Sequence, residues 1–301
     1  MEELKTEIQR YLDVCEHLKG LSALTLKAYR IDLCQFSEFV VERNWLSKEV
    51  LTEYIEAQHV RYKPKSAKRK IACVKAFYRY MELEDIIPEN PFHRIQIKYK
   101  EPIVLPKTIA LNDVQHILKY GYDKLNTAET AYQKLAAVRN VLIIELLFST
   151  GMRVSEISHL KLENIDLESN TIYIYGKGSK ERVMCIANPD IKRLLKKYLD
   201  LRKSDLPFLF VNKQDNRYAE QSIRNMVNTY AKAANIAQHI TPHMFRHTFA
   251  TALLEEDVNI RYIQQLLGHS SITTTQIYTH ISTSKIRRIL ADKHPRNNFR
   301  L

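Results

Sequence analysis

The chain has 301 residues, of which 45% are hydrophobic and 27% charged, while only six are glycine and nine are proline. This composition excludes collagen-like, low-complexity and generally disordered proteins. The scarcity of glycine and proline disfavours an all-β sandwich, which needs many turns. Because 301 residues approach the upper size of a single core, two mainly helical domains are expected.

Lysine and arginine outnumber aspartate and glutamate by 46 to 34, which gives a net charge of +12. Such an excess favours a polyanionic partner, with nucleic acid as the first candidate. The N-terminus carries acids where a secretory signal needs positive charge, and the most apolar stretch, residues 141–148, is too short to cross a membrane. The four cysteines are scattered without a CxxC pair. We therefore expect reduced thiols and a cytoplasmic protein that makes no membrane contact.

The first third of the chain shows four segments with helical periodicity. They cover residues 4–18, a stretch that begins after Ser22 or Thr25 and reaches residue 40, residues 48–58, and a stretch from about residue 64 to 81. Four helices with short connections predict a small bundle. The fourth lies in a run, residues 59–79, that contains eight Lys and Arg and no acid. Such a run indicates either a solvated helix face or a surface that binds phosphates.

Periodicity lapses in the segment KYKEPIVLPK, which contains two prolines. This segment is the best candidate for a domain boundary. We expect an N-terminal domain over residues 1–97, a linker over residues 98–107 and a second domain over residues 108–301.

The second domain is predicted to be mostly helical, with one β-hairpin. Helices are expected over residues 112–120 and 129–149, after residue 153, and from residue 191 to the end with breaks near residues 207, 242 and 268. Residues 171–175 and 181–186 alternate with period two around the loop GKGSK, which is typical of a hairpin. The predicted fold class is mainly α: a small N-terminal helical bundle and a larger, mostly helical domain with a small antiparallel β-sheet.

Two short motifs in this domain invite a ligand interpretation. The GKGSK loop joins two strands and lacks the Walker A pattern, so it is either an ordinary turn or a loop whose glycines let Lys177 approach a ligand backbone closely. His243 and His247 have the spacing of a zinc pair, but the HExxH glutamate is absent and no cysteine lies nearby. We therefore expect no metal site there.

A set of basic residues and one tyrosine follows in the same domain, each with an ordinary structural explanation when taken alone. The set is Arg153, Lys177, His243, Arg246, His269 and Tyr278. Arginine forks match phosphodiester oxygens, and fixed cations stabilise the charge that develops on phosphorus. A tyrosine hydroxyl can act as the nucleophile, while His or Lys moves protons. The set contains no carboxylate cluster for Mg²⁺, so phosphoryl transfer without metal or cofactor is expected.

Three stretches, residues 149–166, 173–186 and 241–280, together with the basic fourth helix, give the sequence a recognisable pattern. It resembles the tyrosine recombinases of the phage-integrase superfamily, most closely the Xer-type and simple integrase branch. The resemblance extends over essentially the whole chain and depends on six matching positions in the same order.

The resemblance implies a role for each of these positions. Arg153 and Arg246 would grip the scissile phosphate, and His269 would be a second phosphate-binding residue. Tyr278 would be the nucleophile that forms a 3′-phosphotyrosyl bond, and His243 would assist its proton transfer.

The resemblance further implies that Lys177 is the general acid for the leaving 5′-oxygen, with Lys180 and Arg182 as rival candidates because the hairpin register is inferred. Glu156, one helical turn after Arg153, would orient nearby cations. The candidate DNA-binding residues are Lys65, Lys68, Arg69, Lys75, Arg79, Lys180 and Arg182.

The partners implied are double-stranded DNA with paired inverted half-sites and further recombinase subunits. The enzyme would act as a homotetramer, or as a heterotetramer with a related recombinase, through a Holliday junction. Residues after Tyr278, including Ile281, Ile286, Ile289 and Leu290, would dock on a neighbouring subunit or pack on their own domain. No arm-binding module is expected ahead of the first helix.

Two other functions remain open from the sequence. One is a catalytically silent, sequence-specific DNA-binding protein, and the other is a type IB-like topoisomerase. For a recombinase, both chromosome-dimer resolution and integration or excision of a mobile element are possible roles.

Overall fold

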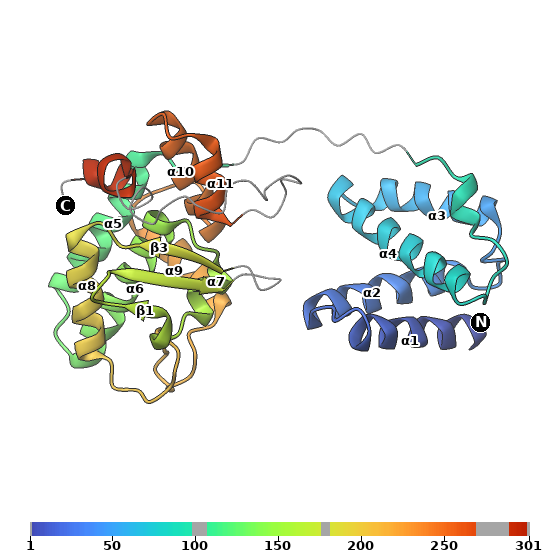
Figure 1. Ribbon diagram of the computed structural model, residues 1–301, viewed down its shortest axis with the longest axis horizontal. Helices are drawn as coiled ribbons and strands as arrows, with labels where there is room; N and C mark the ends of the chain where they lie inside the picture. Colours follow the sequence, from blue (N-terminus) through green and yellow to red (C-terminus); the bar gives the residue numbers. More distant parts are fainter. Residues whose placement is uncertain (1, 98–106, 176–180, 269–288, 300–301) are drawn as a thin grey trace. The chain divides into compact units, whose positions relative to one another are not determined.

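The computed structural model describes residues 2–97, 107–175, 181–268 and 289–299. The chain divides into two compact units, residues 1–104 and 105–301, whose elements are labelled in Figure 1. The units are mainly helical, and the second contains a small antiparallel sheet, so the predicted fold class is confirmed. Of the expected linker, residues 98–106 lie outside the described residues.

The first unit is built from amphipathic helices. They are α1 (Glu2–His17), α2 (Ala23–Phe39), α3 (Lys48–Arg61) and α4 (Pro64–Leu83), followed by the short 3₁₀ helix η1 (Pro91–Arg94). The side chains of Ser22 and Ser47 accept backbone N–H groups at the starts of α2 and α3. Pro64 occupies the first turn of α4, where no intrahelical donor is needed. The apolar faces meet in a core rich in buried aromatic side chains, among them Phe36 and Tyr78.

The second unit is organised around one buried helix. Its helices are α5 (Leu111–Asn126), α6 (Ala131–Thr150), α7 (Val154–His159), α8 (Pro189–Leu201), α9 (Glu220–Ala233), α10 (Pro242–Glu255) and α11 (Ile260–Leu267), with the 3₁₀ helices η2 (Leu162–Asn164) and η3 (Pro295–Asn298). Almost every residue of α6 from Ala137 to Thr150 is buried, because α5, α8 and α10 pack around it. This places the end of α6, and the turn that follows, in the centre of the unit.

The sheet has the strand order β1-β2-β3, with β1 (Ile165–Asp166), β2 (Thr171–Tyr175) and β3 (Glu181–Cys185) all antiparallel. Ile174 lies opposite Arg182, and Ile172 lies opposite Met184. Ile172, Ile174 and Met184 are buried whereas Tyr173 is exposed, so one face of the hairpin packs on the core.

One break in the last helical region occurs at a position without glycine or proline. The chain leaves α10 through Asp257, whose φ of +58° is left-handed, and Asn259 then caps α11. Aspartate adopts this conformation more readily than most residues, so the chain turns here although the helical apolar pattern continues on both sides.

The described part of the C-terminal segment, residues 289–299, packs on its own unit. Leu290 is buried in the core, and the ring Nε2 of His294 lies 2.8 Å from the Ser149 carbonyl. Arg296 forms a buried ion pair with Glu145 of α6 at 2.9 Å. Leu290 therefore follows the second alternative, packing on its own domain, while Ile281 and Ile286 lie outside the described residues. No described helix is long and apolar enough to span a membrane.

Candidate active site and DNA-binding surface

The turn after α6 determines where Arg153 lies. Gly151 ends the helix at φ +60°, and a Cβ there would come within 2.7 Å of a Phe249 ring carbon and 2.8 Å of a Leu267 methyl. Left-handed backbone and close packing together require glycine at this position. Two residues later Arg153 is the N-cap residue of α7, so its side chain lies beside this tightly packed turn.

Arg153 and Arg182 share one carboxylate, that of Glu156. Oε1 accepts hydrogen bonds from Nη1 of Arg153 and from Nη1 of Arg182, each at 2.8 Å. Oε2 accepts the backbone N–H of Arg153 at 2.7 Å and Nη2 of Arg182 at 2.6 Å. The side chains of Glu156 and Arg182 are 7% and 8% exposed, whereas that of Arg153 is 35% exposed. Of the two arginine side chains, that of Arg153 is therefore the more accessible to solvent.

The environment of Glu156 keeps its carboxylate charged. Burial alone would raise the pKa, but the hydrogen bonds and charge of Arg182 and the hydrogen bonds from Arg153 outweigh it. The net effect is a pKa below the ordinary glutamate value, so the group is ionised at neutral pH.

Arg246 lies on α10 and connects the ends of two other helices. Its Nη1 donates to the Gly151 carbonyl at 2.7 Å and its Nη2 to the Leu267 carbonyl at 2.5 Å. Burial, together with the charge of Arg153, lowers its pKa to about 10, which still leaves a cation at neutral pH. Arg246 and Arg153 therefore both lie near the corner formed by Gly151, close enough for the charge of one to affect the other.

His243 lies one turn before Arg246 on α10, at an exposed position. Partial desolvation and the positive charges of Arg246 and Arg153 lower its pKa below the usual value. The imidazole is therefore neutral at pH 7 and able to accept a proton. Within the described ranges, no three His, Cys, Asp or Glu side chains are grouped so that they could hold a metal ion.

The remaining expected catalytic residues lie outside the described residues: Lys177 and the rival Lys180 in residues 176–180, and His269 and Tyr278 in residues 269–288. The last described residue before His269 is Gly268, which ends α11 at φ +63°. A Cβ on Gly268 would lie 3.1 Å from Cδ of Arg182, so this turn packs directly on the Arg182 side chain.

The basic run on α4 divides between the surface and the interior. Lys65, Lys68, Arg69, Lys75 and Arg79 are all exposed. Lys65, Lys68, Lys75 and Arg79 follow one another at helical spacing and form an exposed stripe, which we call the α4 basic stripe.

Two neighbouring cations of this helix have an internal partner. Asp32 of α2 is fully buried, and its carboxylate accepts hydrogen bonds from Arg69 and, at 2.9 Å, from the buried Lys70. Lys70 is therefore a structural residue, and Arg69 is held at the edge of the bundle while the rest of its side chain remains exposed.

The sequence predicts that Arg182 binds DNA or rivals Lys177 as the general acid, whereas in the structure its side chain is only 8% exposed and pairs with Glu156. The signal was present in the strand pattern, because Arg182 shares a face of β3 with the buried Met184 and lies opposite the buried Ile174. This placement favours a role inside the site over a contact with DNA.

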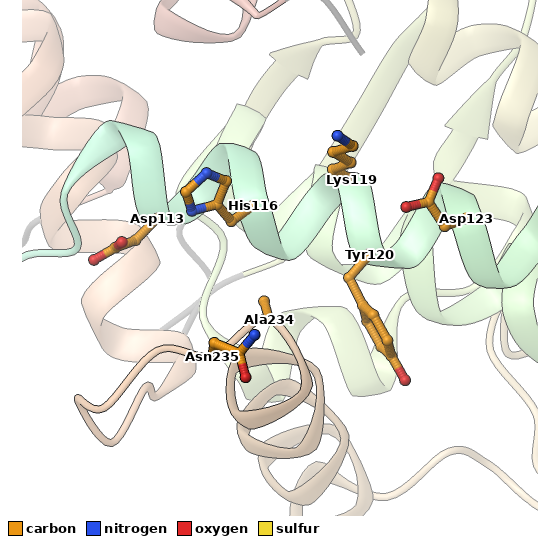
Figure 2. A pocket seen from close by; sticks show the side chains of 7 residues that line it. All are labelled: Asp113, His116, Lys119, Tyr120, Asp123, Ala234 and Asn235. Carbon is orange, nitrogen blue, oxygen red and sulfur yellow. The ribbon is translucent and has the colours of Figure 1, made fainter.

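A shallow surface hollow lies elsewhere on the second unit. Figure 2 shows its lining side chains, which come from α5 and from the turn directly after α9: Asp113, His116, Lys119, Tyr120, Asp123, Ala234 and Asn235. Of the expected catalytic residues that the structure describes, Arg153, His243 and Arg246, none lines this hollow.

Comparisons with known proteins identify the family of the chain. Residues 112–285 match the phage integrase family, and residues 8–85 match the phage integrase N-terminal SAM-like domain. A tyrosine recombinase of Agathobacter rectalis is 48% identical, with 99% of each chain covered. Tyrosine recombinase XerC of Thermodesulfovibrio yellowstonii is 34% identical over 96% of each chain.

Solved structures share the fold. XerH site-specific recombinase bound to difH substrate superposes with a TM-score of 0.67 at 23% identity, covering 92% of this chain and 81% of that one. A lambda integrase dimer bound to a core site gives a TM-score of 0.68 at 16% identity, covering 92% and 99%. With the family match and the full-length relatives together, the chain belongs to the phage integrase family and is a tyrosine site-specific recombinase.

Proposed function

We propose that the chain cuts and rejoins DNA strands through a 3′-phosphotyrosyl intermediate, with Tyr278 as the nucleophile. The observation that supports this most strongly is the convergence of Arg153 and Arg246 at Gly151, one exposed and one held by two carbonyls. Two guanidinium groups at one corner match the non-bridging oxygens of a phosphodiester.

The reaction is a transesterification that balances without a co-reactant. The Tyr278 hydroxyl oxygen attacks phosphorus and forms the P–O bond, while the bond from phosphorus to the 5′-oxygen breaks. Neutral His243 takes the tyrosine proton, and Lys177 supplies a proton to the leaving 5′-oxygen. In the second half, the 5′-hydroxyl of a partner strand attacks the phosphotyrosine, so the energy of the broken bond is conserved and no cofactor is needed.

Arg153, Arg246 and His269 act on the phosphate itself. Negative charge grows on the non-bridging oxygens as phosphorus becomes five-coordinate, and preorganised cations stabilise that charge. Glu156 supports Arg153, as the contacts to its side chain and backbone N–H indicate.

The remaining assignments concern DNA and assembly. Residues 1–97 form a core-DNA-binding domain that presents the α4 basic stripe to phosphates, residues 98–107 a linker, and residues 108–301 the catalytic domain. The substrate is double-stranded DNA with paired inverted half-sites, bound in the cytoplasm by a homotetramer or by a heterotetramer with a related recombinase. A solved lambda integrase tetramer bound to a Holliday junction supports this assembly, with a TM-score of 0.67 to this chain. The same chemistry serves chromosome-dimer resolution and the integration or excision of a mobile element.

The test uses a nicked suicide substrate, whose cleaved end diffuses away and leaves protein attached to DNA. Wild type and a control, Tyr132→Phe at an exposed tyrosine of α6, should form a covalent complex, while Tyr278→Phe should bind DNA without forming one. Arg153→Ala and Arg246→Ala should lose far more cleavage than affinity. Covalent capture by Tyr278→Phe, or equal losses of cleavage and affinity in both arginine variants, would overturn the proposal.

A further inference from the structure

Arg182 is a buried cation that the proposed chemistry does not use. Its side chain is 8% exposed, and its Nε–H has no hydrogen-bond acceptor among the residues that the structure describes. Burying a guanidinium with one unpaired donor is unfavourable, so a purely stabilising function explains its position poorly.

Arg182 occupies half of the hydrogen-bond acceptor positions of Glu156. A carboxylate offers about four acceptor positions. Arg182 fills two of them, the backbone N–H of Arg153 fills the third and Nη1 of Arg153 fills the fourth. The Arg153 guanidinium therefore uses one of its N–H groups on Glu156, while its side chain remains 35% exposed.

Removing Arg182 would change this balance. Arginine and carboxylate prefer to pair through two parallel hydrogen bonds, and two acceptor positions on Glu156 would become vacant. Arg153, the N-cap residue of α7 three positions before Glu156, would then turn its guanidinium onto Glu156 and away from solvent. The phosphate would lose donors without any change in the residues that touch it.

A second contact extends this influence to the end of α11. The Arg182 side chain packs on Gly268, where a Cβ would meet Cδ at 3.1 Å and Nη1 at 3.4 Å. Arg182 therefore joins β3, Glu156 on α7 and the turn that precedes His269.

We propose that Arg182 is a positioning residue: by occupying Glu156 it leaves the Arg153 guanidinium free to bind the scissile phosphate. This inference rests on the proposed function and replaces the DNA contact expected for Arg182.

The test is a double-variant experiment on single-turnover cleavage of the suicide substrate. Arg182→Met keeps an apolar stem but frees Glu156, and it should lower the cleavage rate by roughly 100-fold, the scale of losing one transition-state donor, with DNA affinity nearly unchanged. Adding Glu156→Gln removes the charge that captures Arg153. The double variant should therefore cleave faster than Arg182→Met alone, by about tenfold for groups in direct contact.

With rates expressed per folded molecule, a residue that merely supports folding predicts no loss of cleavage rate in Arg182→Met and no gain on adding Glu156→Gln. An unchanged rate in Arg182→Met, or a double variant no faster than Arg182→Met, would overturn the inference. Arg182→Lys, which offers a point charge in place of a fork, provides a second variant if Arg182→Met unfolds, and it should give an intermediate rate that Glu156→Gln again raises. Tyr278→Phe is assayed in parallel: covalent capture by that variant would refute the proposed function, whatever the order of the Arg182 variants.

Discussion

Replacing Glu156 by glutamine should destabilise the second unit strongly, although the two side chains have nearly the same shape. Glutamine offers one acceptor oxygen and places an NH₂ group against the donors of Arg182, whose side chain is 8% exposed. Breaking a buried ion pair from one side costs about 3–5 kcal/mol, because the remaining charge is left buried and unpaired. For a unit of this size, each kcal/mol corresponds to about 2–4 °C in Tm.

Calorimetry or urea unfolding of the full chain would measure this loss in the transition of the second unit. The matched control is the double variant Glu156→Gln/Arg182→Met, which removes both charges and should recover much of the lost free energy of unfolding. A loss below about 1 kcal/mol for Glu156→Gln, as is typical of exposed pairs, would refute the inference that the pair is buried and structural.

The stability difference between wild type and Glu156→Gln should depend on pH in a defined direction. Because the pKa of Glu156 is lowered in the folded chain, its stabilising contribution is complete above the unfolded value of about 4.3. That contribution is lost as pH falls through the folded pKa. The difference between wild type and Glu156→Gln should therefore be constant near neutral pH and shrink in acid, and a difference that grew in acid would contradict the assigned hydrogen bonds.

Three further outcomes are expected. Lys75→Ala/Arg79→Ala should weaken DNA binding on all sequences and reduce the slope of log K against log salt by about 2, as titrations at several salt concentrations would show. Arg296→Met should lower the free energy of unfolding by about 3–5 kcal/mol, measured in urea, because it leaves Glu145 buried without its cation. The rate of single-turnover cleavage should be independent of pH around 7 and should fall only when the pH drops below the usual histidine pKa. The reason is that the pKa of His243 is lowered and its neutral form is the proposed base. A rate that already falls as the pH is lowered to 7 would contradict this role.

The local part of the fold could be predicted from the sequence because its signals are local. Ser22, Ser47 and Pro64 start helices where capping chemistry indicates, and the alternation in residues 171–175 and 181–185 forms the expected hairpin. The end of α6 at Gly151 followed these same rules.

The contacts that shape the site could not be predicted in the same way, because their partners are distant in sequence. Arg246 is held by carbonyls of Gly151 and Leu267, which the sequence alone does not bring together. Lys70 belongs to the basic run by sequence, but Asp32, on a different helix, provides it with a buried counterion. Burial of a charge is decided by such pairing, which composition and spacing along one helix do not show.

Attack of Tyr278 on the DNA phosphate would leave a covalent bond whose position can be determined. Wild-type protein trapped on the suicide substrate would be digested with protease and nuclease, and the peptide carrying the nucleotide would be sequenced by tandem mass spectrometry. We expect a nucleotide 3′-phosphate on the hydroxyl of Tyr278. A nucleotide attached to any other residue, or cleaved DNA with no protein bound, would contradict it.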